Sequence, residues 1–464
     1  MFGRPGRSVL ATVCAGGLLV SIDGSIVNVA LPSIGRDLGI RDNELVWVVN
    51  AYLLAFSGLT LVAGRIGDLL GFRRLFLIGL YLFTVASVVG GIATHAEMLM
   101  AARAAQGAGG AIVWVTSLSL ALLLFQDEQE RTKALSAFTF VNIGAGTLAS
   151  LFGGVLVSLG TWRWVLLVNL PIGILLIVMS KRLLPGDTPK AARDGIDVAG
   201  AFAITGALIL AVCSIQIWSE SLREDLLWKW LLFASVSLVL LFVYLERRAR
   251  HPILPSILFR YRNLWIGTLI EVLATAGIYV WSFVSTIYLQ RVLHYTPLEV
   301  GLVFLPMNLL TGVVGLLAGT RIMNRFDTKI RVNVGILLAG LGVVLFVGEH
   351  VNTTFWGAPF LGSLLVGLGL GIASTPLTIE TLREVPAAKS GIASGLVNTS
   401  SIMGASFGLA LAVGLSVASI DPNAAMGGGG REAGFQYQIA FALCSAFLGV
   451  ACLIGVTQLG RKRL

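Results

Sequence analysis

The sequence predicts an all-α polytopic membrane protein with fourteen transmembrane helices. Hydrophobic residues make up 56% of the 464 residues and charged residues only 12%, whereas a soluble domain averages about 25% charged residues. The apolar residues gather in continuous runs of about 20 residues, which is the length that a helix needs to cross a bilayer. A transmembrane β-barrel is excluded because its strands alternate apolar and polar residues over about ten positions.

The apolar runs follow one another from one end of the chain to the other. The first begins after Arg4 and Arg7 and continues to Pro32, beyond the short core of a signal peptide, so a retained first helix is expected. The fourteen predicted spans cover residues 8–31, 45–64, 75–94, 98–124, 135–158, 163–181, 196–217, 228–246, 263–286, 299–320, 332–348, 357–378, 391–419 and 435–458.

The basic residues predict how the chain is oriented in the membrane. The formal net charge is +9, from 33 Lys and Arg against 24 Asp and Glu. With a cytoplasmic N-terminus, the segments on the cytoplasmic side hold 25 of these basic residues and the opposite side holds 7, while Arg103 lies inside a span. Because cytoplasmic loops are enriched in Lys and Arg, we expect a cell-membrane protein with both termini in the cytoplasm. The basic residues form no nucleic-acid motif, so no nucleic-acid partner is expected.

Several classes of function find no support in the sequence. The four cysteines and four histidines lie in apolar runs or near their ends. Because they lack metal-ligand spacing, neither a disulfide framework nor a metal site is expected. The phosphate-binding pattern G-x-x-x-x-G-K-[ST] is missing, which argues against direct use of ATP. No nucleophile–base motif stands out either. We therefore expect a protein that is not an enzyme and has no resident cofactor.

A weak internal repeat predicts the domain organisation. The spacing from Asp68 to Arg73, after the second span, recurs from Asn324 to Lys329, after the tenth. Repeated halves are typical of transporters, with the substrate site between them. Two copies eight helices apart fit two six-helix bundles with a pair of helices inserted between them. The expected division is residues 1–185 for the first bundle, 186–250 for the inserted pair with its linkers, and 251–464 for the second bundle.

Asp23 is the first candidate functional residue. It lies in the middle of the first span, where a carboxylate is costly and usually faces a cavity or a partner. Ser21, Ser25 and Asn28 share one face of this helix, and Asp23 lies roughly opposite. Asp23 and Asn28 are therefore candidates for proton coupling or substrate contact. The alternative is a structural hydrogen bond that fixes helix packing.

Arg103 and Gln106 are candidates in the fourth span, one helical turn apart on the same face. A buried Arg stays charged and needs acceptors, which a carboxylate such as Asp23 would supply. Gly107 and Gly110 would let another helix approach closely. The alternative role is a purely structural pair.

Glu271 is a further carboxylate within the ninth span. It lies about 12 Å along the helix from the predicted cytoplasmic end, and so away from the interface. It could bind a cationic substrate or a second proton, or it could line a water-filled vestibule without a specific role.

The segment after the second span holds Asp68, Arg73 and Arg74. It is expected to be a loop, in which Gly64, Gly67 and Gly71 give the backbone room for a tight turn. A carboxylate here could bind the free N–H groups of a neighbouring helix N-terminus and latch one conformer. The alternative is a solvated loop whose basic residues serve topology alone.

These segments resemble the major facilitator superfamily, and specifically its 14-helix drug:proton antiporter branch of the quaternary-ammonium and multidrug efflux type. Residues 64–74 are similar to the family's signature loop, 99–111 to its fourth-helix motif, and 21–32 to the first-helix motif of the branch, which usually has Thr in place of Ser25. Other similar stretches are 162–164 with 169–173, 288–290 with Gly301, and 391–399.

The fifth span departs from the branch's G-x-x-x-G-P-x-x-G-G motif. The final pair is kept as Gly153 and Gly154, but Ala149 and Ser150 stand where the motif has Gly-Pro. Proline would kink the helix and free a carbonyl, so a straighter helix is expected, with Ser150 bonding back to the chain. This departure puts the usual exchange cycle in question.

The resemblance implies the major facilitator fold, with two extra central helices between two six-helix bundles. It also implies a monomeric secondary active transporter in the lipid bilayer. Its activity would be export of drug-like or amphipathic small molecules in exchange for protons, with the proton gradient as the energy source. One alternative is a dedicated exporter of an endogenous metabolite or antibiotic. Another is an uncoupled lipid flippase or a membrane-embedded enzyme, although the clustered His, Asp and Glu that an enzyme needs are missing.

Overall fold

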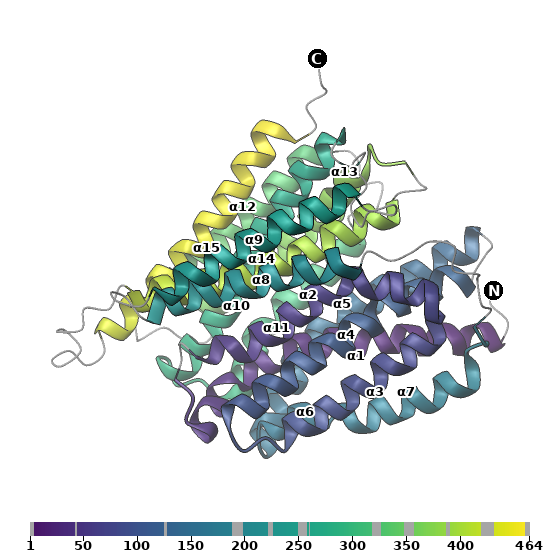
Figure 1. The fold of residues 1–464 in the computed structure, drawn as a ribbon. Helices are drawn as coiled ribbons and strands as arrows, with labels where there is room; N and C mark the ends of the chain where they lie inside the picture. The colour runs from purple at the N-terminus through teal and green to yellow at the C-terminus, as the bar shows by residue number, and fades with distance from the viewer. Residues whose placement is uncertain are drawn as a thin grey trace. The chain divides into compact units, whose positions relative to one another are not determined.

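The computed structural model describes residues 4–41, 44–124, 128–187, 198–220, 226–248, 258, 260–317, 326–347, 357–386, 390–418 and 431–459. Over these residues the chain is helical, with short turns and no strand (Figure 1). The helices are α1 (Arg4–Leu38), α2 (Leu45–Leu70), α3 (Phe72–Gly91), α4 (Ala96–Leu124), α5 (Glu128–Leu159), α6 (Arg163–Leu167), α7 (Asn169–Leu183), α8 (Val198–Glu220), α9 (Leu227–Arg248), α10 (Arg262–Arg291), α11 (Pro297–Leu317), α12 (Thr328–Val347), α13 (Ala358–Leu382), α14 (Ser390–Ala418) and α15 (Arg431–Gln458).

Each predicted span is helical over most of its described residues, which confirms the predicted all-α membrane fold. Eleven helical stretches among the described residues are long and apolar enough to cross a bilayer, and shorter apolar stretches lie within α2 and α8. The sixth predicted span, 163–181, forms two helices, α6 and α7, that meet at Val168. Pro171 explains this break because it has no N–H to donate to the carbonyl one turn before it.

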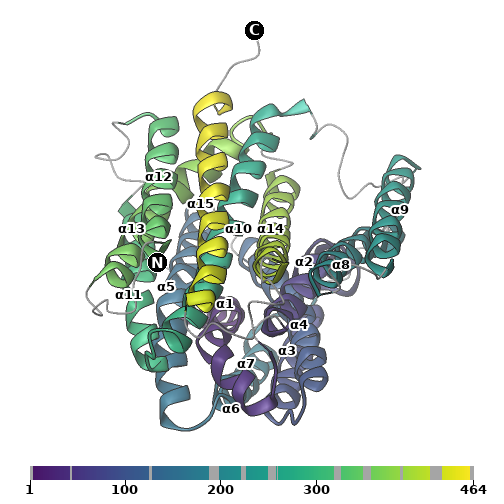
Figure 2. The ribbon, with the colours of Figure 1, turned by 90° about the vertical axis from the view of Figure 1, so that its left-hand side faces the viewer.

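The chain divides into two compact units. The first comprises residues 1–208 and 237–253, and the second comprises residues 209–236 and 254–464. In the first unit α3 packs along α4 and α7 (Figure 1), and in the second α10 packs beside α14 and α15 (Figure 2). Helices α8 and α9, the predicted inserted pair, contribute residues to both units. The predicted boundaries at 186 and 250 stay a prediction, and Asn324, in the second copy of the repeat, lies outside the described residues.

The first helix is longer than predicted. It continues through Pro32 to Leu38, whereas the apolar run was expected to end near residue 31. Proline removes one backbone hydrogen bond, and packing offsets that loss because Leu31 and Ile34 on either side are fully buried. The extension adds almost two turns to α1 beyond the proline.

The expected loop from Gly64 is mostly helix, so this part of the prediction is wrong. Helix α2 runs on to Leu70, and only Gly71 interrupts the chain before α3 begins at Phe72. Gly71 has φ of 92°, a conformation that side chains with a Cβ rarely adopt. One glycine therefore makes the whole turn, because its conformation reverses the chain without further loop residues.

Helix α5 is unbroken from Glu128 to Leu159. The expected straighter course stays a prediction, because α1 is also unbroken although it contains Pro32. Ala149, Gly153 and Gly154 are buried on α5. A Cβ at Gly153 would lie 3.0 Å from the carbonyl oxygen of Ile26, so this glycine lets α5 approach α1 closely. The side chain of Ser150, and with it the expected bond back to the chain, lies outside the described residues.

Candidate functional site

The centre of the first unit holds a buried ion pair between Asp23 on α1 and Arg103 on α4. The Nη1 atom of Arg103 lies 2.7 Å from Oδ2 of Asp23. Their side chains are 0% and 1% exposed. Removing two charges from water is costly, and only excellent geometry with further hydrogen bonds offsets that cost. The surroundings of the pair therefore decide whether it is stable.

Three polar side chains complete the shell of Asp23. Asn169 on α7 donates from Nδ2 to Oδ1 of Asp23 at 2.6 Å, and Gln106 donates from Nε2 to the same oxygen at 3.2 Å. Ser87 on α3 accepts from Gln106 at 2.7 Å and donates to the carbonyl of Phe83 at 2.8 Å. Both carboxylate oxygens of Asp23 are therefore engaged, by groups from α4 and α7.

Arg103 is satisfied as thoroughly as its partner. Its Nη1 atom also donates to Oε1 of Gln106 at 3.0 Å, and its Nε atom donates to the carbonyl of Val48 at 3.3 Å. The guanidinium carbon lies 4.4 Å from the ring centroid of Tyr52, a cation–π contact. The Tyr52 hydroxyl in turn donates to the carbonyl of Val20 at 3.3 Å. We call Asp23, Ser87, Arg103, Gln106 and Asn169 the Asp23 network.

The glycines of α4 explain how Arg103 reaches its partners. A Cβ at Gly107 would collide with the carbonyl oxygen of Tyr52 on α2, and a Cβ at Gly109 would lie 2.7 Å from the backbone nitrogen of Phe83 on α3. The missing side chains let three helix backbones approach closely. Arg103 and Gln106 lie one turn from these contacts and point into the same interior.

The Asp23 network joins three helices of the first unit. The Asp23–Arg103 pair is neutral overall, and the hydrogen bonds around it connect α1, α4 and α7. Loss of either charge would leave the other one buried without its partner, which is strongly unfavourable.

The structure brings Asp23, Arg103 and Gln106 together, but two other predicted residues stay outside this network. Asn28 is half-buried on α1 and makes no hydrogen bond within the described residues. Glu271 belongs to α10 of the second unit. Their proposed roles in proton coupling or substrate contact stay predictions.

Sequence reasoning missed Asn169, Ser87 and Tyr52 as members or neighbours of the site. Asn169 stands in a stretch that carried the family resemblance, yet nothing in that stretch pointed to Asp23. The available signal was the polar residue itself, since an amide in an apolar run needs a buried partner. Ser87 and Tyr52 carry no comparable signal because Ser and Tyr are common in membrane helices.

A second polar cluster lies where α2 ends, α3 begins and α7 ends. Its carboxylate belongs to Asp187. Asp187 accepts hydrogen bonds from the backbone N–H groups of Arg73 and Arg74 at 2.9 and 3.0 Å. These are free donors of the first turn of α3, which favour a negative charge. The sequence assigned such a role to Asp68, whose side chain lies outside the described residues.

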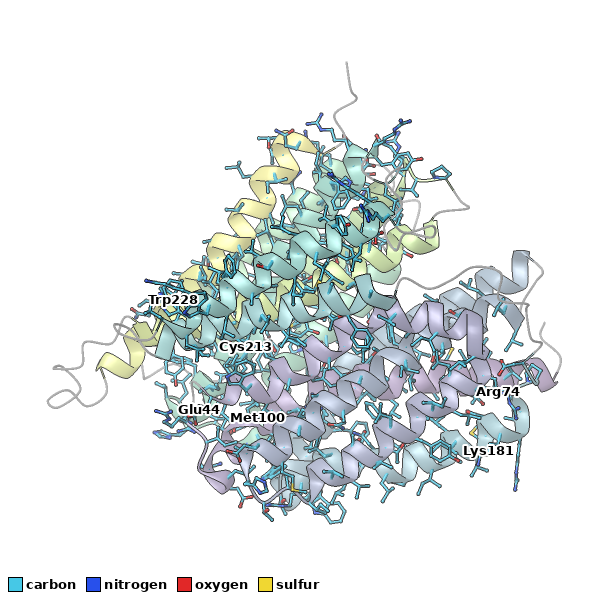
Figure 3. The ribbon with its side chains drawn as sticks, in the orientation of Figure 1. Glu44, Arg74, Met100, Lys181, Cys213 and Trp228 are labelled. Atoms are coloured by element: carbon cyan, nitrogen blue, oxygen red, sulfur yellow. The ribbon has the colours of Figure 1, made fainter. Side chains whose placement is uncertain are left out.

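Arg73 ties the same cluster to α7. Its Nη2 atom donates to the carbonyl of Lys181 in the last turn of α7 at 2.8 Å. Figure 3 places the labelled Arg74 and Lys181 at neighbouring helix ends. A Cβ at Gly71 would overlap the carboxyl group of Asp187, so Gly71 is needed for space as well as for its positive φ. The predicted latch residues Gly71, Arg73 and Arg74 thus hold α3 to α7 within the first unit.

We expect Asp187→Ala to destabilise the purified protein by about 1–2 kcal/mol, as loss of a helix cap does. Asp187→Asn keeps one acceptor oxygen, so its stability should lie between those of the wild type and the alanine variant. Thermal unfolding in detergent measures both. Glu384→Ala is the control, because Glu384 is an exposed carboxylate that makes no hydrogen bond within the described residues. Equal stability of Asp187→Ala and the wild type would contradict the cap.

The sequence is similar to a family of transport proteins and to several export and resistance proteins. The family model described as "Major Facilitator Superfamily" matches residues 13–409. The cephamycin export protein CmcT of Amycolatopsis lactamdurans is 34% identical over 97% of this chain and 91% of its own length. The puromycin resistance protein pur8 of Streptomyces alboniger is 34% identical over 87% of this chain and 80% of its own. The multidrug resistance protein Stp of Mycobacterium tuberculosis is 33% identical over 87% of this chain and 75% of its own.

A solved structure supports the same fold. The POT family transporter PepTSo superposes with a TM-score of 0.70 at 15% sequence identity, over 98% of this chain and 99% of that one. At this identity the likeness concerns the fold alone. The family assignment depends instead on the sequence match, which spans most of the chain, and on relatives that share a third of their residues with it. The chain belongs to the Major Facilitator Superfamily.

Proposed function

We propose that this secondary active transporter exports drug-like, amphipathic molecules from the cytoplasm in exchange for protons. The observation that carries the proposal is the buried Asp23–Arg103 pair, a titratable group held in the interior of a bundle of apolar helices. The relatives named for cephamycin export and for puromycin and multidrug resistance support a cargo of this kind. Family membership also identifies the chain as a transport protein rather than an enzyme.

The Asp23 network supplies the coupling step in this proposal. In one conformer Asp23 is ionised and bound by Arg103, Gln106 and Asn169. A proton arriving from the acidic side neutralises Asp23 and releases its hold on α4 and α7. The other conformer exposes Asp23 to the cytoplasm, returns the proton there and restores the pair. Exchange follows when cargo and proton stabilise opposite conformers.

The membrane setting follows from the family and the charge pattern. The chain is a multi-pass membrane protein, and we place it in the cell membrane as a monomer with both termini in the cytoplasm. The bias of Lys and Arg towards one side supports this orientation. The cytoplasmic side then includes the Asp187 cluster, which joins α3 to α7.

A dedicated exporter of one product is the second candidate. The name of the cephamycin export protein, which matches nearly the whole chain, favours it. The two candidates share the coupling step and differ in how many cargoes the protein accepts. A panel of unrelated compounds separates them, because a dedicated exporter would move only one chemical family.

Proteoliposomes with an acidic lumen and a trapped pH-sensitive dye test the proposal. Addition of an exported compound should raise the lumenal pH while the compound accumulates inside, and a protonophore should abolish both. Puromycin, lincomycin and a cephamycin form the first panel, with protein-free liposomes as the control. Accumulation of any of these without proton movement would show an uncoupled transporter and overturn the antiport proposal.

A further inference from the structure

The second unit contains a cavity of about 160 Å³ that the Asp23 network does not involve. Helix α10 contributes Glu271, Thr275 and Tyr279, which lie one helical turn apart on one face. The other walls come from α12, α13 and α15, including Ala339, Ser374 and Leu448. All of these residues belong to the second unit.

Small side chains leave this space open. Ala274 on α10, Gly335 and Ala339 on α12 and Ala373 on α13 all line the cavity. A Cβ at Gly335 would lie 2.5 Å from the carbonyl oxygen of Gly369, so α12 and α13 are in close backbone contact there. The helices cannot move closer to fill the cavity, because their backbones already touch beside it.

The carboxylate of Glu271 has no counter-charge among the residues that the structure describes. It forms no hydrogen bond or ion pair within the described residues. Two other carboxylates on membrane helices are paired: Asp23 with Arg103, and Glu380 with Arg383 at 3.3 Å. A carboxylate inside a membrane helix bundle is costly without a partner. Glu271 therefore fits a site whose positive group comes from a ligand.

The hydroxyl groups around Glu271 are unpartnered as well. Thr268 and Thr286 on the same helix donate to carbonyls one turn back, at 2.6 and 2.8 Å. Thr275, Tyr279 and Ser374 make no such bond within the described residues, although each lines the cavity. Glu271 and these three hydroxyl-bearing residues therefore line one small space whose walls are otherwise mostly apolar.

We propose that this cavity binds a protonated amine, with Glu271 as its counter-charge and hydroxyl groups accepting its N–H donors. The oxygen set favours an ammonium that carries N–H bonds, because a fully alkylated one could donate to none of them. Cavities of about 150 Å³ accommodate a benzene-sized molecule, so the site holds one ring or head group. This inference rests on the proposed transport function, in which the amine is part of the cargo.

Binding of benzylamine to the purified protein at neutral pH tests the inference, with benzyl alcohol as its uncharged counterpart. Isothermal titration without any ion gradient measures both. We expect benzylamine to bind the wild type about tenfold or more tightly than benzyl alcohol, the effect of one charge-assisted contact. Benzyltrimethylammonium, which lacks N–H donors, should bind more weakly than benzylamine.

Two variants decide the assignment. Glu271→Gln should remove the preference for the amine and leave benzyl alcohol binding unchanged, which shows that the cavity is intact. Ala339→Leu fills the cavity from α12 and should weaken the binding of both compounds. Glu380→Gln is the matched control, since its carboxylate lies outside the cavity, and it should keep the preference. A preference that survives in Glu271→Gln, or binding unchanged by Ala339→Leu, would overturn the proposal.

The outcome is separable from that of the proposed function. Binding is measured at equilibrium, so it does not require proton exchange. If the wild type exchanges cargo for protons but does not prefer benzylamine, only the amine site is wrong. If benzylamine binds as expected while cargo moves without protons, the antiport proposal fails and the amine site stands.

Discussion

Asp23→Asn should abolish concentrative export while leaving downhill movement of cargo. The substitution keeps the size of the side chain and removes its charge and its titration. Asn169 and Gln106 can still reach the position, but no proton can be exchanged there. An antiporter without its exchangeable proton cannot convert a pH gradient into a cargo gradient. We expect accumulation ratios near one at every imposed pH gradient.

Proteoliposomes with matched protein content measure this effect. Uphill accumulation is recorded over a series of pH gradients, and downhill flux is recorded without one. Thr12→Ala is the matched control, because Thr12 lies on the same helix and donates to the carbonyl of Ser8, away from the Asp23 network. Wild-type accumulation by Asp23→Asn, with unchanged pH dependence, would exclude Asp23 as the coupling residue. If Glu271 shares the coupling role, Asp23→Asn combined with Glu271→Gln should accumulate no more cargo than either single variant.

Arg103→Met should destabilise the protein by about 3–5 kcal/mol, the usual cost of breaking a buried pair from one side. The variant leaves Asp23 charged and buried, with only Asn169 and Gln106 as donors. Adding Asp23→Asn removes the stranded charge, so the double variant should recover most of the lost stability without recovering transport. Thermal unfolding of the purified protein in detergent measures all three variants.

The same unit supplies a control with an exposed ion pair. Arg163 lies 2.5 Å from Asp37, but these side chains are 31% and 45% exposed. Exposed pairs contribute about 0–1 kcal/mol, because water screens both charges. Arg163→Met should therefore change stability far less than Arg103→Met. Similar losses of stability in the two variants would mean that burial does not determine how much the Asp23–Arg103 pair contributes to stability.

Much of the fold was predictable from the sequence because a membrane span is a local property. About 20 apolar residues must form a helix in a bilayer, whatever the rest of the chain does. The predicted spans therefore fall on helix along most of their described length. The break at Val168 and the single-residue turn at Gly71 depend on neighbouring residues, and the prediction missed both.

The site was only partly predictable for a different reason. A charged residue within an apolar run is easy to identify in a sequence, and so Asp23, Arg103 and Glu271 were all candidates. Nothing local says which partner each one finds. Asp23 binds Arg103, which is 80 residues away in the sequence, and Asn169, which is 146 residues away. Asp187 binds the N-terminus of α3 across 114 residues, and no local pattern pointed to it.

The helical membrane fold, the family motifs and the costly charged residues could all be read from the amino-acid sequence. Which of those charges are neutralised depends on how the helices pack. Close packing at Gly107 and Gly109 brings α4 against α2 and α3, and so Arg103 reaches Asp23. In the second unit, helix packing leaves Glu271 beside a cavity with no cation among the described residues around it. The physical reason is that electrostatic partners are set by distances between helices, which no single helix encodes.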